Sequence, residues 1–302
     1  MTDPSSFSSP IFPLVSVNMI TYNSLGHLDK AILSVLNQTY SNFELIIVNA
    51  DKNMISRLEY WKSKDSRIKL YYKEGLQVAP SRAFAVTLSS GKYIVIHDSD
   101  DYSDPKRFEK QVNYLESHPN VGCVGSYLRA IVDNSDHTIL NIKYATFSFL
   151  IRFYSYFESP IGHGTSMLRK SVLDEHNINY RGHENGFPED YYLFLQMLEY
   201  TDMACIPEYL YIYNCGVGNS CKGRTSVRLG ILVPLIWRTF MYKRYGFIVN
   251  NKHFKRDIIK YIIKFSLKER LNIFQILIIC ASLSVFMLNS RVMKNRIAKM
   301  PK

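Results

Sequence analysis

The sequence is poor in cysteine and lacks the cysteine patterns of metal centres and disulfide scaffolds. Its 302 residues include five cysteines, an odd number, and no CxxC pair. Cys215 and Cys221 lie close together, but a zinc site needs clustered histidine or cysteine partners, and these are missing. We therefore expect reduced thiols in a cytosolic compartment.

A secretory signal is also lacking, as are internal repeats and low-complexity segments. The first residues, MTDPSSFSSPIFP, are polar and have no positively charged segment before an apolar run. Apolar residues make up 47% of the chain and are spread along it, which excludes disorder for most of its length. This length fits one large α/β domain or two small ones.

Acidic residues are scarce only in the last fifth of the chain. Up to Trp237 there are 22 basic and 24 acidic residues, whereas Arg238 to Lys302 contain 15 basic and 2 acidic residues. The formal net charge of +11 therefore comes entirely from the tail. A protein that binds nucleic acid usually carries its basic patch on the folded domain, so we expect no nucleic-acid partner. An anionic surface such as a membrane is a candidate partner for the tail alone.

Apolar runs alternate with helical patterns over the first hundred residues. Continuous apolar runs predict buried strands at residues 14–19, 44–49, 67–73 and 92–98. Helical spacing and helix-ending residues predict helices around residues 28–36, 57–64 and 80–90. This alternation indicates an α/β domain with a largely parallel central sheet and flanking helices. Such a sheet binds its ligand at the carboxyl ends of the strands.

The second hundred residues give shorter and weaker signals. We predict strands at 121–133 and 206–214, helices at 105–117 and 187–200, and a loop, strand and helix within 159–176. Residues 134–156 give only a weak signal, and a glycine-rich loop, GVGNSCKGR, follows the last strand.

An acidic cluster, Asp98-Ser99-Asp100-Asp101, falls at the carboxyl end of the fourth predicted strand. Two carboxylates one residue apart can hold a divalent cation together with a diphosphate, because the cation neutralises charge on the departing phosphate. A solvated acidic turn is the alternative, since a bare DxD is common.

Three segments together resemble the bacterial glycosyltransferases of family 2. They are LVSVNMITYNSLGHLDKAILSVLNQTYSNFELIIV, SGKYIVIHDSDDYSDPKRFEKQV and EDYYLFLQML, which occur in the family in the same order and at similar separations. The resemblance covers residues 14–215. It implies a GT-A fold, which is Rossmann-like, a nucleotide-diphosphate sugar donor, and inversion of the anomeric centre.

The resemblance and the charge pattern together predict three parts of the chain. A polar extension at residues 1–13 precedes a GT-A domain at residues 14–230. Within that domain, residues 14–104 are expected to hold the nucleotide sugar and residues 105–230 the acceptor. Residues 231–302 are expected to form a basic helical tail.

The resemblance also implies residues that bind the donor. Thr21, Tyr22 and Asn23 match the loop after the first strand, which lines the nucleotide pocket. Arg82 matches a basic residue that approaches the nucleotide or its diphosphate. A diphosphate in a cleft requires cationic donors, although an exposed helix charge is the alternative for Arg82.

Asp98 and Asp100 match the metal-binding DxD, which implies Mn²⁺ or Mg²⁺ as cofactor. Asp98 and Ser99 are also expected to contact the nucleotide sugar. Asp101 either assists the pair or caps the following turn.

Glu189 and Asp190, after Pro188, match an acidic pair of the family whose aspartate serves as general base. The chemistry requires a base, because the acceptor hydroxyl must lose its proton as it attacks. A base on the face opposite the leaving diphosphate implies a single displacement with inversion. We expect Asp190 to be the base and Glu189 to orient the substrate. Stabilisation of the helix dipole is the alternative for both.

Several positions depart from the family pattern. Asn49 and Ala50 stand where the family has two acidic residues, the second of which reads the nucleotide base. Either Asp51 takes over after a shift of one residue, or the base is read differently. Gln77 stands where a glycine is common.

The histidine that many relatives carry after the strand at 206–214 is also absent. Candidates for phosphate contact in that loop are Asn219, Ser220, Lys222 and Arg224; a flexible linker is the alternative. His163, in IGHGTSM, is expected on the acceptor side of the cleft, either as a contact to an acceptor hydroxyl or as a structural loop histidine.

The basic tail has a two-faced helical pattern from His253 to Arg270. Arg256, Lys260, Lys264 and Lys268 fall on one side, and Phe254, Ile258, Tyr261, Ile262 and Phe265 fall on the other. Residues 271–290 carry no charge, with basic residues on both sides. An interfacial or re-entrant helix pair, a membrane span, and a helix packed on the domain remain alternatives.

The sequence therefore predicts an inverting, metal-dependent glycosyltransferase of surface-polysaccharide synthesis. A lipid-linked oligosaccharide is the expected acceptor, and the inner face of the bacterial cytoplasmic membrane is the expected location. A transferase with a soluble or protein acceptor is one alternative. The missing acid at Ala50 and the missing histidine make a non-catalytic binding or scaffold protein another.

Overall fold

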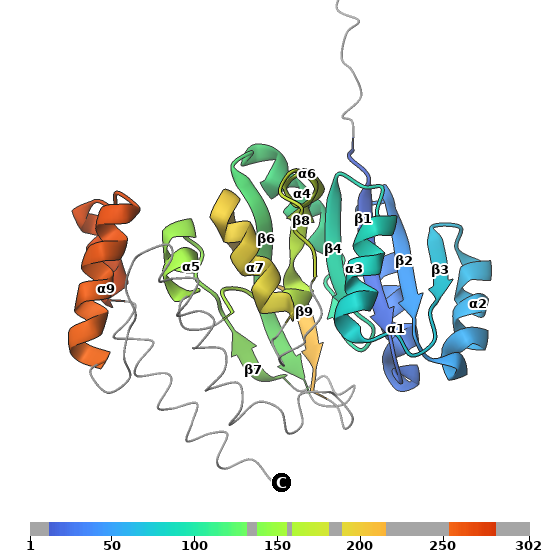
Figure 1. Cartoon of the computed structure of the whole chain (residues 1–302). Helices are drawn as coiled ribbons and strands as arrows, with labels where there is room; N and C mark the ends of the chain where they lie inside the picture. The colour runs from blue at the N-terminus through green and yellow to red at the C-terminus, as the bar shows by residue number, and fades with distance from the viewer. Residues whose placement is uncertain (1–11, 132–137, 156–158, 181–188, 216–253, 282–302) are drawn as a thin grey trace, which may run out of the picture. The chain divides into compact units, whose positions relative to one another are not determined.

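The computed structural model describes residues 12–131, 138–155, 159–180, 189–215 and 254–281 (Figure 1). They fall into two compact units. The first comprises residues up to Ile151 together with Ser159–Arg224, and the second comprises Arg152–Glu158 together with Thr225–Lys302. Each unit is described by itself.

The first unit contains a nine-stranded sheet with the order β3-β2-β1-β4-β8-β6-β9-β5, in which β7 pairs with β6. The strands are β1 (Val15–Thr21), β2 (Phe43–Asn49), β3 (Ile68–Tyr72), β4 (Tyr93–Asp98), β5 (Tyr102–Ser103), β6 (Val121–Ile131), β7 (Thr138–Ile142), β8 (Met167–Arg169) and β9 (Asp202–Asn214). The helices are α1 (Leu25–Leu36), η1 (Lys52–Met54), α2 (Ile55–Lys64), α3 (Val78–Leu88), α4 (Arg107–Ser117), α5 (Ser148–Tyr154), η2 (His163–Thr165), α6 (Lys170–Glu175) and α7 (Glu189–Tyr200).

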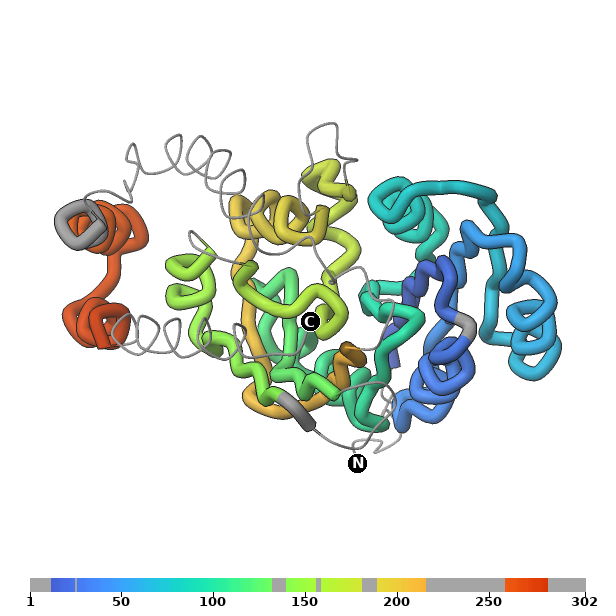
Figure 2. The backbone as a smooth tube through the Cα atoms, turned by 90° about the horizontal axis from the view of Figure 1, so that it is seen from below, coloured from blue at the N-terminus to red at the C-terminus, as the bar shows by residue number. Residues whose placement is uncertain are grey.

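The first four strands of the sheet, β3, β2, β1 and β4, are all parallel. The apolar residues of β1, β2 and β4 are buried on both faces of the sheet, as the continuous apolar runs predict. On one face Val17, Leu45 and Val95 share a core with α1 and α4. On the other face, Ile46 and Val48 pack against α3. Figure 2 shows α1 and α3 on opposite sides of the sheet.

The remaining strands mix directions. β8 is antiparallel to β4 and β6, β6 is parallel to β9, and β5 is antiparallel to β9. A core of Ile94, Leu168, Phe194 and their neighbours lies between these strands and α7. The predicted mixed α/β architecture, with a largely parallel central sheet and flanking helices, is confirmed.

Two regions differ from the sequence prediction. β9 begins at Asp202, four residues before the predicted start, and its register against β6 shifts between Ile206 and Tyr209. Pro207 lies in this irregularity, and its lack of a backbone N–H agrees with the interrupted pairing there. β7 and α5 lie in the stretch where the sequence signal is weak.

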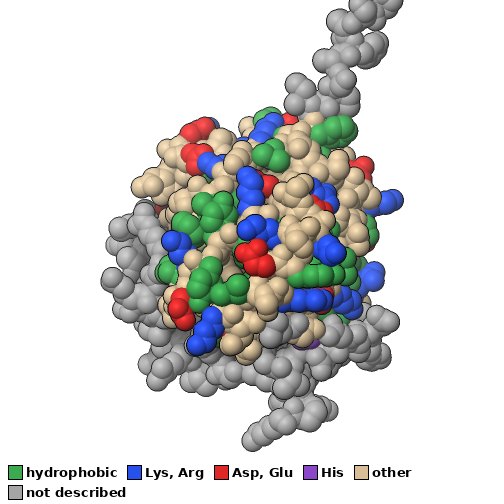
Figure 3. Space-filling view, turned by 90° about the vertical axis from the view of Figure 1, so that its right-hand side faces the viewer, with side chains coloured by type: hydrophobic (Ala, Val, Ile, Leu, Met, Phe, Trp, Pro, Cys, Tyr) green, Lys and Arg blue, Asp and Glu red, His purple; other side chains and the backbone are tan. Residues whose placement is uncertain are grey.

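Charges of both signs cover the side of the first unit next to β3 and α2. Figure 3 views this side and shows lysine and arginine side chains interspersed with aspartate and glutamate. Ion pairs of this unit include Arg57 with Asp29 and Arg67 with Asp65. This mixture agrees with the near-neutral charge of the chain up to Trp237.

The second unit is built on α9 (Phe254–Lys268), and residues 273–281 form a further helical stretch. Tyr261 and Phe265 of α9 are fully buried and pack on Phe153, at ring distances of 5.3 and 5.4 Å. Arg152 and Glu269 form an ion pair of 3.5 Å. In the described part of the chain, none of the helices has the length and apolar character to cross a membrane. Residues 282–290 of the uncharged stretch lie outside the described residues.

A buried arginine ties α4 to the sheet. Arg107, in the first turn of α4, is fully buried, and its guanidinium donates hydrogen bonds to the carbonyl oxygens of Ile96 (3.0 Å) and Ser166 (3.3 Å). It also donates to the side-chain oxygens of Ser103 (2.9 Å) and Gln111 (3.1 Å). Burial lowers the pKa of Arg107 to about 10, so the side chain is still a cation at neutral pH.

We expect Arg107→Leu to lower the free energy of unfolding by about 3 kcal/mol, because it removes the buried hydrogen bonds that the guanidinium donates. Urea denaturation followed by circular dichroism would measure the loss. Lys106→Gln, at the exposed neighbouring position, should change stability by no more than about 0.5 kcal/mol. A loss of the same small size for Arg107→Leu would contradict this account.

Candidate active site

The acidic cluster follows β4 directly at the carboxyl edge of the sheet. Asp98 is the last residue of β4, and the N–H of Asp101 donates to its carbonyl oxygen at 3.3 Å, which closes a tight turn. Asp98 and Asp100 are partly exposed, whereas Ser99 and Asp101 are buried. The turn therefore presents two of its three carboxylates to the site.

Asp101 is turned inward and binds β9. Its carboxylate accepts a hydrogen bond from the Tyr211 hydroxyl and one from the Asn214 N–H, both at 2.8 Å. Burial raises the pKa of Asp101 well above its ordinary value, and the charges of Asp98 and Asp100 raise it further. This side chain joins the acidic turn to the end of β9.

The Tyr211 hydroxyl also fixes the start of the turn, because it accepts a hydrogen bond from the Asp98 N–H at 3.3 Å. The ring is buried and lies 4.9 Å from the Arg107 guanidinium. Gly164 of η2 packs directly against it, and a Cβ at Gly164 would overlap the Tyr211 hydroxyl. Tyr211 is therefore held from several sides.

Asp98 and Asp100 fit a divalent cation by their chemistry. Burial raises the pKa of Asp100 to about 6, and the charge of Asp98 adds to this effect. A bound cation would relieve that repulsion, and carboxylate oxygens are the ligands that Mg²⁺ prefers. Within the described residues, no group of three histidine, cysteine or acidic side chains is arranged to hold a metal. Phosphate oxygens of a donor would therefore have to complete the coordination.

Arg82 of α3 links the acidic turn to the acidic pair of α7. Its guanidinium lies 3.1 Å from Asp98 Oδ1 and 3.7 Å from Glu189 Oε1. The side chain is only 14% exposed, so the alternative of an exposed helix charge is wrong. Burial works against its charged form, but Asp98, Tyr180 and Glu189 outweigh burial and raise the pKa of Arg82.

His163 and Tyr180 support the same guanidinium. Arg82 donates to the His163 ring, and the ring shares a hydrogen bond of 2.7 Å with the Tyr180 hydroxyl. Burial lowers the pKa of His163 well below its ordinary value, and the charge of Arg82 lowers it further. The neutral imidazole orients Arg82, and a contact to an acceptor stays a prediction.

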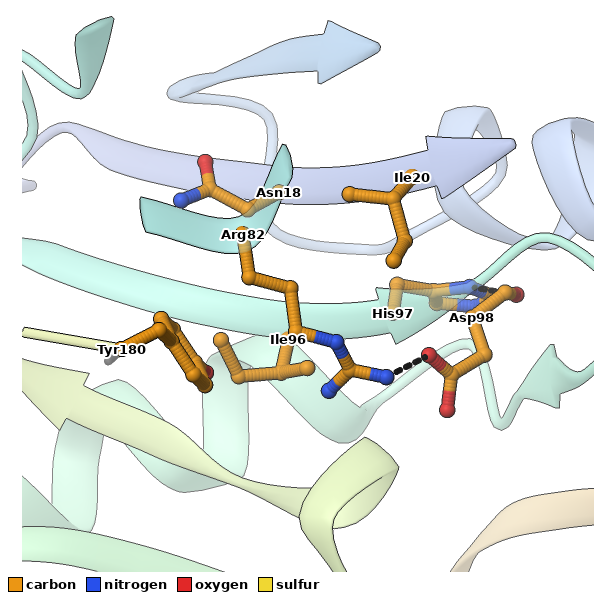
Figure 4. Close-up of a pocket in the computed structure, with 7 residues that line it drawn as sticks. All are labelled: Asn18, Ile20, Arg82, Ile96, His97, Asp98 and Tyr180. Atoms are coloured by element: carbon orange, nitrogen blue, oxygen red, sulfur yellow. Dashed lines mark hydrogen bonds and ion pairs between the residues drawn. The ribbon is translucent and has the colours of Figure 1, made fainter. Parts of the chain in front are cut away.

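A small cavity opens beside this group (Figure 4). Figure 4 shows Arg82 and Asp98 joined by an ion pair within it. Its lining residues are Asn18, Ile20, Arg82, Ile96, His97, Asp98 and Tyr180. The Asn18 amide nitrogen is buried and has no hydrogen-bond partner among the described residues.

Glu189 and Asp190 occupy the first turn of α7. The Asp190 carboxylate accepts from the N–H of Tyr191 at 2.7 Å. Burial raises the pKa of Asp190, and the charge of Glu189 raises it further. A carboxylate with a raised pKa is a better proton acceptor near neutral pH. Pro188 lies outside the described residues.

The loops after β1 and β2 meet at the same edge. The Thr21 hydroxyl donates to the Asn49 side chain at 3.0 Å, and the Asn23 N–H donates to Asp51 Oδ2 at 3.3 Å. Asp51 also caps η1 by accepting from the Asn53 N–H at 2.9 Å. Tyr22 extends into solvent with 72% of its surface exposed. The predicted residues Thr21, Tyr22, Asn23 and Asp51 therefore lie at one edge of the sheet. Recognition of the nucleotide base by Asp51 stays a prediction.

Several residues of the site were not predicted. Tyr180 and Tyr211 are two of 22 tyrosines, and the sequence offers no signal that separates them from the others. Asn18 and His97 lie inside predicted strands, where a polar residue is the only hint. Asn219, Ser220, Lys222 and Arg224 lie outside the described residues.

A family model described as glycosyl transferase family 2 matches residues 16–176, more than half of the chain. The chain belongs to glycosyltransferase family 2. A family member from Haemophilus influenzae, an uncharacterised glycosyltransferase, is 32% identical over 212 residues. The match covers 67% of this chain and 65% of that protein.

Two relatives from Escherichia coli carry functional names. The O-antigen biosynthesis glycosyltransferase WbnJ is 33% identical over 192 residues, with coverage of 62% of this chain and 73% of WbnJ. The UDP-Glc:alpha-D-GlcNAc-diphosphoundecaprenol beta-1,3-glucosyltransferase WfgD is 29% identical over 206 residues, with coverage of 67% and 74%. The family and its link to O-antigen synthesis agree with the prediction from sequence.

Among solved structures, residues 1–349 of S. aureus TarS in complex with UDP-GlcNAc match with a TM-score of 0.59 at 15% identity. The match covers 78% of this chain and 74% of the TarS chain. At this identity the likeness shows the fold alone, and it confirms the predicted GT-A fold of this family 2 member.

We expect the free energy of unfolding to decrease as the pH rises from about 4 to about 6, because Asp100 ionises less readily in the folded state. The folded pKa of about 6 lies above the ordinary value of 3.8, so the folded state holds a proton that the unfolded state has lost. Asp100→Asn should remove this decline, which amounts to about 3 kcal/mol. Urea denaturation of both proteins at several pH values, with EDTA present, would measure it; parallel pH profiles would refute the assignment.

Tyr211→Phe should lower the free energy of unfolding by about 1–3 kcal/mol, because Asp101 and the Asp98 N–H each lose a buried partner. Tyr60→Phe is the control. This tyrosine of α2 is 46% exposed, so water can replace its hydroxyl. Equal losses in denaturant titrations of the two variants would contradict the role of Tyr211.

Proposed function

We propose that this protein is an inverting, metal-dependent glycosyltransferase. It moves a sugar from a nucleotide diphosphate to a sugar hydroxyl of a lipid-linked acceptor in surface-polysaccharide synthesis. The observation that carries the proposal is the bridge made by Arg82, which contacts Asp98 on the donor side and Glu189 beside the base. Residues for binding the diphosphate and for accepting a proton therefore share one site.

The donor binds at the carboxyl edge of β1, β2 and β4. Thr21, Tyr22 and Asn23 line the nucleotide pocket, and the Asp51 carboxylate reads the base. Asp51 is suited to this because each of its oxygens accepts only one backbone N–H and keeps capacity for another donor.

The diphosphate lies next to Arg82, Asp98 and Asp100, with Ser99 in the same turn. Asp98 and Asp100 would hold Mn²⁺ or Mg²⁺, and such a cation would neutralise charge on the diphosphate. Arg82 donates charge-assisted hydrogen bonds to phosphate oxygens. His163 keeps the guanidinium oriented and lies on the acceptor side of the site.

Asp190 removes the proton of the acceptor hydroxyl. The hydroxyl oxygen forms a bond to the anomeric carbon as the bond from that carbon to the diphosphate oxygen breaks, and the electron pair leaves with the diphosphate. Attack from the face opposite the leaving group inverts the anomeric centre. Glu189 orients the substrate. It contacts Arg82, which also contacts Asp98 on the donor side.

The names of the relatives support the acceptor class. WfgD is named for transfer to a sugar on diphosphoundecaprenol, and WbnJ for O-antigen synthesis. By analogy, this chain uses a lipid-diphosphate-linked saccharide at the cytoplasmic face of the cytoplasmic membrane. Its basic tail associates with the membrane surface.

Asp190→Asn should lower the rate of sugar transfer by about 10²–10⁴-fold, because the acceptor hydroxyl loses its base. The assay uses a panel of nucleotide sugars with a lipid-linked acceptor extract and Mn²⁺ or Mg²⁺, and EDTA should abolish turnover. Asp174→Asn, an exposed aspartate on α6, is the matched control and should keep full activity. Full activity of Asp190→Asn would overturn its role, and failure to turn over any donor would favour a non-catalytic binding protein.

A further inference from the structure

The second unit exposes an apolar surface that the sequence pattern did not single out. Ile259, Ile263 and Leu267 of α9 are 59%, 54% and 75% exposed. They are spaced four residues apart, so they form one stripe along the helix. Seven of the fifteen exposed large apolar side chains in the described residues lie between Ile259 and Ile278. Such a concentration marks an interaction surface rather than scattered surface residues.

The apolar face that the sequence pattern predicts for α9 packs inside the protein. Tyr261 and Phe265 belong to that face, and both are fully buried against Phe153. Helix α9 is therefore anchored through one apolar face and presents a second one outward. Of the alternatives for this helix, packing within the protein therefore describes the face with Tyr261 and Phe265, since the ring contacts with Phe153 hold them inside the unit.

A row of lysines accompanies the exposed stripe. Lys260, Lys264 and Lys268 each follow a stripe residue by one position, which places the row about 100° around the helix. Helix α9 contains five basic residues and one acidic residue. An apolar stripe beside a cationic row is typical of a helix that lies in a membrane interface.

Further apolar side chains are exposed beyond α9. In the helical stretch at residues 273–281, Ile273, Phe274 and Leu277 are 63%, 74% and 58% exposed, and no residue of that stretch is charged.

We propose that Ile259, Ile263 and Leu267 insert into the surface of an anionic lipid bilayer, with Lys260, Lys264 and Lys268 on the lipid phosphates. This surface explains how the proposed enzyme would reach a lipid-linked acceptor, and to that extent it rests on the proposed function. A second copy of the chain is a poorer occupant, because pairing the stripes would bring two lysine rows together. An anionic bilayer matches both the apolar and the cationic row.

The test measures binding of the full chain to phosphatidylcholine vesicles with and without phosphatidylglycerol, by flotation. The double variant Ile263→Glu, Leu267→Glu should bind at least about tenfold more weakly. Lys260→Gln should weaken binding only to the anionic vesicles, by about fivefold. The matched control is Leu33→Glu, a 43% exposed leucine of α1 in the first unit, which should bind like the wild type.

Undiminished binding of the double variant, or no binding of the wild type, would overturn the proposal. A dimer of the wild type that dissociates in the double variant would identify a second copy as the occupant and also overturn it. With a detergent-dispersed acceptor, the double variant should turn over donor as fast as the wild type. Vesicle binding without turnover of any donor would refute the proposed function and leave the lipid surface standing.

Discussion

Five carboxylates lie around the carboxyl edge of β4 and the first turn of α7, and their mutual repulsion must be offset before a site can form there. Arg82 offsets part of it by contacting Asp98 and Glu189 at once. The Asp101 carboxylate is stabilised in another way, because it is buried and accepts two hydrogen bonds from β9. The balance of these charges determines where α3, β9 and α7 lie relative to the acidic turn. It also leaves Asp98 and Asp100 as the carboxylates open to a cation.

The support of this site extends into the core through uncharged and cationic groups. Tyr211 fixes the turn by its hydroxyl, and the Arg107 guanidinium lies against its ring. Arg107 in turn bonds to backbone oxygens in β4 and next to β8. Rigid positioning of reacting groups is what a transferase requires, because the acceptor oxygen must approach along one line. The buried contacts of Tyr211 and Arg107 thus hold the acidic turn in place at the edge of the sheet.

The parallel half of the fold was predictable from the sequence, because strands that are buried on both faces have continuous apolar sequences. The start of β9 did not follow, because its first four residues, Asp-Met-Ala-Cys, include no β-branched residue that would indicate a strand. At the site, Asp98 and Glu189 were predictable from the ordered motifs of the family. Tyr180 and Tyr211 were not, since the Arg82 guanidinium beside Tyr180 and the Asp101 carboxylate bonded to Tyr211 lie about 100 positions away in the chain. In α9 the sequence pattern identified the apolar face with Tyr261 and Phe265, but neither its partner Phe153 nor the second, exposed apolar stripe.

The contact between Gly164 and Tyr211 has an evolutionary consequence. Any side chain at position 164 would overlap the tyrosine hydroxyl, so the two positions cannot change independently. A mutation at Gly164 becomes tolerable only after Tyr211 has been replaced by a smaller residue, and that first step removes a bond to the acidic turn. The pair therefore restricts the order in which this part of the chain can diverge. Gly164 does not have a positive φ, but this contact constrains it as strongly as a contact with substrate would.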